Sequence, residues 1–464
     1  MSEAANGDNL SKDPPSRISQ ELRNFYAEHN VDLARLEQVG KSGESDPFPF
    51  RFVRLNPRFD RGESLKILNK EVGEHKVEGK EPHKPIPVNW IGSEWGFFAL
   101  PASFPLASSE SFTSGRVYGM DVSSGAGAAA LLSNSFDTNP SQTGDHNSAA
   151  DISDEIRVLD LCCCPGLKLC AMADHFRDQK ATIIGVDVSE PRMALCKKIV
   201  TKYQLSHSDD AEPANTSSIP KAKANIQLYC QDGTSFGTNW KEQNLVFDTR
   251  SALEDISVRG KRKRMNKSAR ARERKRLKEI ASEDWTRSQQ STTNEDSNQE
   301  SQAPGAPGIL LFDYVLVDAE CSTDGSLKHM KERLKSGTDD PKQAEETTVI
   351  ETNDMLTDQR QLDELVDLQK RLLESGYRLL KPGGKLVYST CSLSHAQNEN
   401  VVKWLLEKYP DDCYSIPVNF LNAKSTLIVE GTLKGTIRFY PNLAKEDMEL
   451  FGDGFFLAKL GKRE

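Results

Sequence analysis

Short apolar runs alternate with longer amphipathic segments from residue 156 to the end of the chain, and this alternation limits the folds open to it. Runs that predict buried strands occur at residues 157–162, 182–188, 225–230, 312–319 and 386–388. Helical patterns lie between them at residues 167–176, 192–203 and 361–380. Repeated strand–helix units predict an α/β fold with a mainly parallel, doubly wound sheet. Residues 436–440 and 454–460 predict an antiparallel pair that closes the sheet.

Three polar, low-complexity tracts interrupt this pattern, at residues 206–224, 233–308 and 331–353. Residues 1–17 are polar and predict a disordered N-terminus. Residues 18–110 predict a small α+β domain, with a helical pattern at its start, then a strand and aromatic residues. Residues 111–464 form the second domain, which starts with a small-residue helix, GAGAAALL, that Ser123 and Ser124 are expected to cap.

Net charge and cysteine content limit the binding partners and the cellular compartment expected for the protein. The 464 residues carry a net charge of −9, so any contact with an anionic polymer is expected to be local. Nine cysteines are an odd number, and three of them are adjacent, which fits neither a disulfide framework nor a CxxC zinc pair. The start is polar, and apolar runs stay well below the roughly 18 residues that a membrane span needs. We therefore expect a soluble, non-secreted protein with reduced thiols in the cytosol or nucleus.

One local exception to the negative charge is the basic segment, residues 259–278, which contains twelve Lys and Arg residues. Such a density predicts either a nuclear address or a patch that binds nucleic acid, whereas a solvated helix within an insertion is the structural alternative. We expect the protein in the nucleus, including the nucleolus, with the cytoplasm as the alternative.

The ends of the first three strands predict a nucleoside site. After the first strand the stretch CCCPGLK forms a tight turn that opens a helix, but it lacks the GxGxxG pattern of pyrophosphate cofactors. Asp187 ends the second strand, where a carboxylate can accept both ribose hydroxyls, and Asp232 follows the third, near an adenine edge. Each acid alone is also a common turn former. Together they outline a site for an adenosine without phosphates, which suggests S-adenosylmethionine.

Two cysteines follow the fourth and fifth strands. Cys391 lies where the run LVYST stops, and Cys321 follows the strand that ends at Asp318. A small buried side chain is the ordinary interpretation of such a cysteine. However, carbon 5 of cytosine accepts a methyl group only after a thiolate adds to carbon 6, and a second thiol can help to release the adduct. Cys391 is therefore the candidate nucleophile, and its thiol pKa is expected to be lowered.

The motifs DLCCCPGLKLC, GVDVSEPRM, YCQDG, VDAECSTDG and LVYSTCSLSHAQNE occur in an order that resembles the RsmB/Nop/Sun family of S-adenosylmethionine-dependent RNA cytosine-5 methyltransferases. The resemblance covers roughly residues 50–460 apart from the insertions. It implies a Rossmann-like methyltransferase fold with a mainly parallel seven-stranded sheet, and an N-terminal domain that is RNA-binding-like. It also implies RNA, either tRNA or rRNA, as the substrate.

The resemblance assigns roles to individual residues. It implies Cys391 as the nucleophile and Cys321 as the releasing thiol. The implied cofactor-binding residues are Cys162, Cys163, Cys164, Pro165, Gly166, Leu167, Lys168, Asp187, Asp232 and Asp318. Three positions depart from the family pattern: Glu320 replaces a usual Pro, Leu167 a usual Gly, and Asn442 a frequent His.

Two other classes of function remain open at this stage. A catalytically silent RNA-binding or ribosome-assembly factor would keep the same fold and cofactor site, and only an activity or adduct assay separates it from an enzyme. A methyltransferase that acts on a protein or small molecule would not need a thiolate, so the two cysteines count against it.

Overall fold

The computed structural model describes residues 20–28, 50–75, 83–133, 155–205, 224–237, 244–253, 310–326, 329, 358–418, 420, 428–441 and 452–464. The basic segment, most of the predicted polar tracts, residues 1–17 and Asn442 lie outside the described residues. Within the described part of the chain, no helix combines the length and the apolar character that a bilayer crossing requires.

Five parallel strands form the centre of the large sheet. In spatial order they are β7 (Ala224–Cys230), β6 (Ala181–Asp187), β5 (Ile156–Asp160), β9 (Phe312–Asp318) and β10 (Leu380–Thr390). Because they are parallel, their carboxyl ends meet at one edge, where open α/β sheets bind ligands. The sequence predicted these strands to within a few residues, except that β10 begins six residues earlier than expected.

Antiparallel strands extend the sheet on both sides, so the described part of the sheet has ten strands rather than the seven expected. They are β8 (Leu245–Asp248) beside β7, β14 (Phe455–Lys462) beside β10, and then β13 (Thr436–Phe439), β12 (Ile428–Glu430) and β11 (Cys413–Ile416). The predicted closing pair is confirmed as β13 and β14. The additional strand β8 lies inside the tract 233–308, which the sequence predicted to be a low-complexity insertion. The sequence did not indicate this strand because its four residues depend on pairing with β7.

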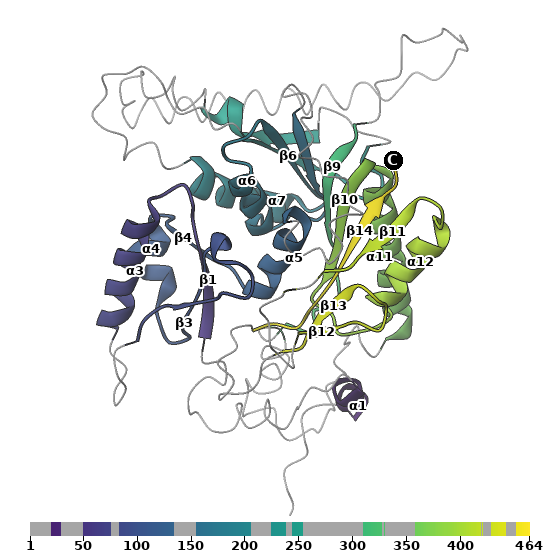
Figure 1. Ribbon diagram of the computed structural model, residues 1–464, viewed down its shortest axis with the longest axis horizontal. Coiled ribbons are helices and arrows are strands. Elements are labelled where there is room, and N and C mark those ends of the chain that lie inside the picture. The colour runs from purple at the N-terminus through teal and green to yellow at the C-terminus, as the bar shows by residue number, and fades with distance from the viewer. Residues whose placement is uncertain are drawn as a thin grey trace, which may run out of the picture.

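Helices cover both faces of the sheet (Figure 1). On one face lie α5 (Val122–Leu132), α6 (Leu167–His175) and α7 (Glu190–Val200), the last continued by a π-helical turn at Thr201–Leu205. On the other face lie α11 (Gln359–Arg378) and α12 (Glu399–Lys408). Successive residues of one strand point to opposite faces: Val158 belongs to the core under α6, and Leu159 to the core under α11.

A second, four-stranded antiparallel sheet precedes the large one. Its spatial order is β2 (Ile86–Pro87), β3 (Phe97–Pro101), β1 (Phe50–Leu55) and β4 (Val117–Gly119). The helical elements of this region are α1 (Gln20–Glu28), α3 (Arg61–Glu74), α4 (Glu110–Thr113) and the 3₁₀ turns Ser93–Trp95 and Leu106–Ser108. Strand β4 lies beyond residue 110, where the sequence predicted the domain to end.

The helix α5 joins the two sheets. Its N-cap is Asp121, which accepts a hydrogen bond from the Ser123 amide at 2.9 Å, so the prediction that Ser123 and Ser124 cap this helix was wrong. The small residues of α5 permit close packing. A Cβ at Gly125 would lie 2.3 Å from the ring of Phe97, so only glycine lets β3 approach the helix this closely.

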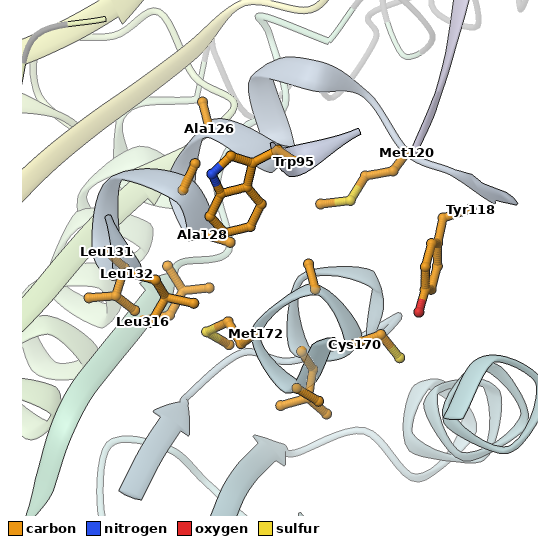
Figure 2. Close-up of a cluster of buried hydrophobic side chains, with 14 of the residues drawn as sticks. Trp95, Tyr118, Met120, Ala126, Ala128, Leu131, Leu132, Cys170, Met172 and Leu316 are labelled. Atoms are coloured by element: carbon orange, nitrogen blue, oxygen red, sulfur yellow. The ribbon is translucent and has the colours of Figure 1, made fainter. Parts of the chain in front are cut away.

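Both sheets share one hydrophobic core (Figure 2). Trp95, Tyr118 and Met120 come from the N-terminal region, whereas Met172 on α6 and Leu316 on β9 come from the large sheet. The alanines and leucines of α5 lie between the two groups. One apolar face of the small sheet is buried in this shared core, and its other face packs in a separate core with α3. The two units are therefore held together largely by the hydrophobic effect.

A buried carboxylate adds a polar connection across the same junction. Asp174 at the end of α6 has a fully buried side chain and accepts hydrogen bonds from Arg54 on β1 at 2.8 Å and from Arg58, three residues after that strand, at 3.1 Å. Tyr118 on β4 donates to it at 2.8 Å, and Gln204 donates at 2.9 Å. Four donors satisfy the charge, as a buried carboxylate requires.

We expect Asp174→Asn to destabilise the protein by about 3–5 kcal/mol, because the buried guanidinium of Arg54 and the partly buried one of Arg58 would lose their counter-charge. Urea unfolding measures the change. Asp178→Asn is the matched control, since the Asp178 side chain is 81% exposed and should change stability by no more than about 0.5 kcal/mol. Equal effects of the two substitutions would contradict this account of the junction.

Candidate active site

Two thiols meet at the carboxyl edge of the sheet. The parallel pairing of β9 and β10 places Asp318 opposite Ser389, and Cys321 and Cys391 follow three and two residues later. Their sulfur atoms lie 3.2 Å apart. Cys321 is buried, and Cys391 is half-buried. The structure thus brings together the two cysteines that the sequence singled out.

Hydrogen bonds between the two cysteine-bearing loops hold the thiols in place. The Gly325 amide donates to the carbonyl of Cys391 at 2.9 Å. The carboxylate of Asp324 is fully buried and accepts from the Leu393 amide at 2.7 Å and from the Ser322 hydroxyl. The two loops therefore form one rigid unit.

A glutamine adds a second connection between these loops and the helix α11. Gln397 accepts from the Ser322 amide at 3.1 Å and donates to the Ser322 hydroxyl at 2.7 Å. Gln369 on α11 donates to Gln397 at 3.2 Å and to the carbonyl of Glu320 at 2.8 Å. Glu320, which stands where the family usually has proline, is itself exposed. Its carboxylate therefore stays outside the buried hydrogen-bond network.

A positively charged side chain, that of Lys168 at the start of α6, lies near the two thiols. Lys168 on α6 donates to Asp318 at 2.6 Å, and Ser389 donates to the other oxygen of Asp318 at 2.7 Å. Burial disfavours the ammonium, but the negative charge of Asp318 outweighs it and raises the pKa of Lys168. The Lys168 charge also interacts with Cys391. The ion pair therefore connects the strand ends of β5, β9 and β10.

The sequence analysis did not single out Asp160, which ends β5 and is 1% exposed. Burial raises the pKa of Asp160 well above its ordinary value, and the neighbouring charge of Asp318 raises it further. An acid directly before the CCC stretch was visible in the sequence, but only the structure shows that it is buried beside Asp318 and Lys168.

The cofactor loop, residues 162–168, turns sharply between β5 and α6. Gly166 is the N-cap of α6 with a φ of +105°, in the left-handed region that favours glycine. A Cβ there would lie 2.7 Å from the sulfur of Cys196 on α7. The loop is further fixed by the Cys163 amide, which donates to the carbonyl of Val186 at 3.0 Å. Leu167, where the family usually has glycine, begins the helix without strain.

The two acids predicted to bind a nucleoside follow neighbouring strands. Asp187 ends β6, is 4% exposed, accepts from the Ser189 amide at 3.0 Å and pairs with Arg192 at 3.3 Å. Burial raises its pKa. Asp232 is exposed and accepts from Thr234. The Gln231 amide donates to the Asp187 carbonyl at 3.0 Å, which holds the two loops side by side.

The prediction that the site lowers the pKa of Cys391 was wrong. The pKa of the Cys391 thiol is raised well above its ordinary value, first because of its hydrogen bond with Cys321 and next because of burial. The charges of Asp318 and Asp324 act in the same direction. The sequence could not reveal this effect, because it depends on the 3.2 Å separation of two thiols 70 residues apart.

The pKa of another thiol, that of Cys196, is shifted in the opposite direction. Hydrogen bonds from Cys163 and Cys164 lower the pKa of Cys196 to about 5. The sequence analysis named the first two cysteines but not Cys196, which lies 33 residues from Cys163 and reaches it only because α7 packs beside the cofactor loop.

The fold and the arrangement at the carboxyl edge of the large sheet are typical of one class of protein, the Rossmann-like methyltransferases. A solved structure, the crystal structure of PH0851, shares the fold with a TM-score of 0.50 and 16% sequence identity, covering 97% of this chain and 70% of that chain. Its low identity limits the comparison to the fold.

Sequence comparison narrows the class. Residues 341–461 match the family model of the 16S rRNA methyltransferase RsmB/F. The ribosomal RNA small subunit methyltransferase F of Shigella flexneri is 33% identical over 162 residues, 34% of this chain and 28% of that protein. The protein of the same name from Shewanella piezotolerans is 32% identical over 155 residues, 33% of this chain and 26% of that protein. The chain therefore spans little more than a quarter of the length of the curated relatives it matches. The matched family model and both relatives carry the name of rRNA methyltransferases, and the chain is similar to them over these residues.

Because the pKa of Cys391 is raised, we expect its alkylation by iodoacetamide to keep accelerating about tenfold per pH unit above pH 9, where a thiol of ordinary pKa levels off. Peptide mass spectrometry of Cys391 measures the rate. Cys321→Ala removes the largest cause of the shift, so at pH 8 it should speed alkylation by about tenfold or more. Cys413→Ala, a buried thiol outside the site, is the control. A wild-type rate that levels off below pH 8 would contradict the raised pKa.

Proposed function

We propose that the protein transfers a methyl group from S-adenosylmethionine to carbon 5 of a cytosine in RNA, through a covalent bond between Cys391 and the base. The observation that carries the proposal is the pair of thiols, 3.2 Å apart, at the ends of β9 and β10. A methyltransferase whose substrate is already nucleophilic would need neither thiol.

The residues of the edge support a sequence of roles. The thiolate of Cys391 adds to carbon 6 of cytosine, which makes carbon 5 an enamine carbon that can accept a methyl group. Release then requires loss of the proton from carbon 5 and cleavage of the carbon–sulfur bond. We assign the removal of that proton to the thiolate form of Cys321, whose sulfur lies 3.2 Å from that of Cys391; the proton becomes that of the Cys321 thiol, and Cys391 leaves as a thiolate. The cation of Lys168 favours the thiolate form of Cys391 electrostatically.

The raised pKa of Cys391 gives the substrate a part in activation. In the ligand-free protein the thiol is held protonated mainly by its hydrogen bond with Cys321. A cytosine bonded to the sulfur of Cys391 would replace the contact with Cys321 and remove this cause. The nucleophile therefore becomes reactive when the base is in place, which limits side reactions of a free thiolate.

The chain's own residues fit the cofactor. When bound, S-adenosylmethionine supplies an electrophilic methyl group. The left-handed Gly166 lets the loop backbone approach a ligand closely at the start of α6. We assign the carboxylate of Asp187 to the ribose hydroxyls and Asp232 to the adenine edge, because a backbone hydrogen bond from Gln231 to Asp187 holds their loops side by side. Asp318, at the end of β9, faces the site together with Lys168.

RNA as the substrate class is supported by the family and by the relatives named as small subunit rRNA methyltransferases. We infer rRNA or tRNA, at a cytosine that can leave its stack to reach both thiols, as in a loop or single-stranded region. The nuclear location expected from the basic segment belongs to the same proposal.

The two cysteines should fail in different ways. Cys391→Ala should abolish methylation and form no adduct, because the covalent bond cannot form. Cys321→Ala should transfer one methyl group per protein molecule and stay attached to its RNA, since release is blocked. Denaturing gel electrophoresis with labelled RNA and bisulfite sequencing measure the two outcomes.

The double substitution Cys321→Ala with Cys391→Ala should lose the trapped band, and Cys413→Ala should behave as wild type. Trapping by Cys391→Ala with normal turnover of Cys321→Ala would reverse the roles. A wild-type protein that binds RNA and methylates none of it would instead indicate the catalytically silent assembly factor.

Substitution of the two acids at the strand ends should weaken cofactor binding and leave the fold intact. Asp187→Ala should weaken S-adenosylmethionine binding by about 1.5–3 kcal/mol through the loss of charge-assisted hydrogen bonds, and Asp232→Ala should weaken it in the same range. Isothermal titration calorimetry gives the affinity, and thermal unfolding shows whether the fold is kept. Asp178→Ala, at an exposed position three residues after the end of α6, is the control. Wild-type affinity in both site variants would refute the assignment.

A further inference from the structure

A second group of thiols lies beside the cofactor loop, apart from the catalytic pair. The sulfurs of Cys163, Cys164 and Cys196 all lie within 4.8 Å of one another. The first two follow β5, and the third is on α7, so the group joins two segments that neighbour each other only in the folded chain. Cys163 and Cys196 are buried, and Cys164 is half-buried.

The spacing of these sulfurs suits a metal ion. A thiolate sulfur binds zinc or a similar ion at about 2.3 Å, so three sulfurs in a plane around one ion lie about 4.0 Å from one another. The sulfurs of Cys163 and Cys196 are 4.0 Å apart. A disulfide would require a separation of about 2.05 Å. The present arrangement therefore leaves room for an ion between the sulfurs.

The donor set selects the kind of ion. Thiolate sulfur is a soft ligand that favours Cu(I) and Zn(II) over hard cations. Structural zinc sites are closed by four protein ligands, whereas the group found among the described residues contains three. Cu(I) accepts three sulfurs in a plane. We propose that Cys163, Cys164 and Cys196 together bind one Cu(I) ion.

The surroundings allow an ion to enter and to be retained. The half-buried Cys164 opens the group to solvent, and the two buried cysteines shield the opposite side. Arg192 donates to the Cys164 carbonyl at 3.3 Å and pairs with Asp187 at 3.3 Å, so the Asp187 carboxylate beside the group is itself neutralised. The bound ion would tie the cofactor loop to α7, next to Asp187, whose carboxylate interacts with Cys164.

The test uses the full-length protein carrying Cys321→Ser and Cys391→Ser, because the catalytic pair is itself a possible Cu(I) ligand. The reduced, metal-free protein is titrated with Cu(I) under anaerobic conditions against a competing chelator. Native mass spectrometry counts the bound ions, and X-ray absorption counts the sulfurs around copper. We expect one ion with three sulfurs at about 2.3 Å.

In the same background, Cys196→Ser should lower the Cu(I) affinity by more than about 100-fold, since loss of a direct ligand exceeds the 10–100-fold cost of outer contacts. Cys170→Ser, a buried thiol on α6 outside the group, should leave the affinity unchanged. Protection of Cys163, Cys164 and Cys196 from alkylation by added Cu(I) tests the site without any substitution of its ligands. Unchanged affinity in Cys196→Ser, fewer than three sulfurs, unprotected thiols or preferential binding of Zn(II) would each overturn the proposal.

Discussion

The register between β9 and β10 is the constraint on which the candidate site depends. Parallel pairing places Asp318 opposite Ser389, and the hydrogen bond between their side chains marks the last paired position. Both cysteines follow within three residues, so their sulfurs meet at 3.2 Å. A slip of one residue would turn every side chain of a strand to the other face of the sheet. The buried apolar residues on both faces of β10 exclude such a slip, and the thiol pair is a consequence of that packing.

The ion pair of Lys168 with Asp318 extends this constraint to the cofactor loop. It connects the helix that follows β5 with the end of β9, and Ser389 connects the same carboxylate with β10. The ends of β5, β9 and β10 are therefore linked through one carboxylate, by an ion pair and a hydrogen bond, at a largely buried position. Because a buried charge is stable only with its partner, any movement of the cofactor loop affects the environment of Cys391. In this way the geometry couples the proposed cofactor site to the proposed nucleophile.

Two groups of thiols lie near this edge. The sulfurs of Cys321 and Cys391 lie 3.2 Å apart, and their contact raises the pKa of Cys391. Cys163, Cys164 and Cys196 are held together by the packing of α7 on the cofactor loop, with Gly166 allowing the close approach. The first pair is suited to covalent chemistry with a base, and the second group to a soft cation.

The sequence alone determined the order of the strands and helices, because apolar periodicity and turn residues act over a few neighbouring positions. It also placed Cys321, Cys391, Asp187 and Asp232 at strand ends, since parallel strands share one edge. Tertiary structure decided what depends on distant partners. Strand β8 exists only through pairing with β7, Asp174 collects donors from three other segments, and Cys196 joins Cys163 across 33 residues. The pKa of Cys391 moved opposite to expectation for the same reason, because proximity and burial are properties of the folded chain.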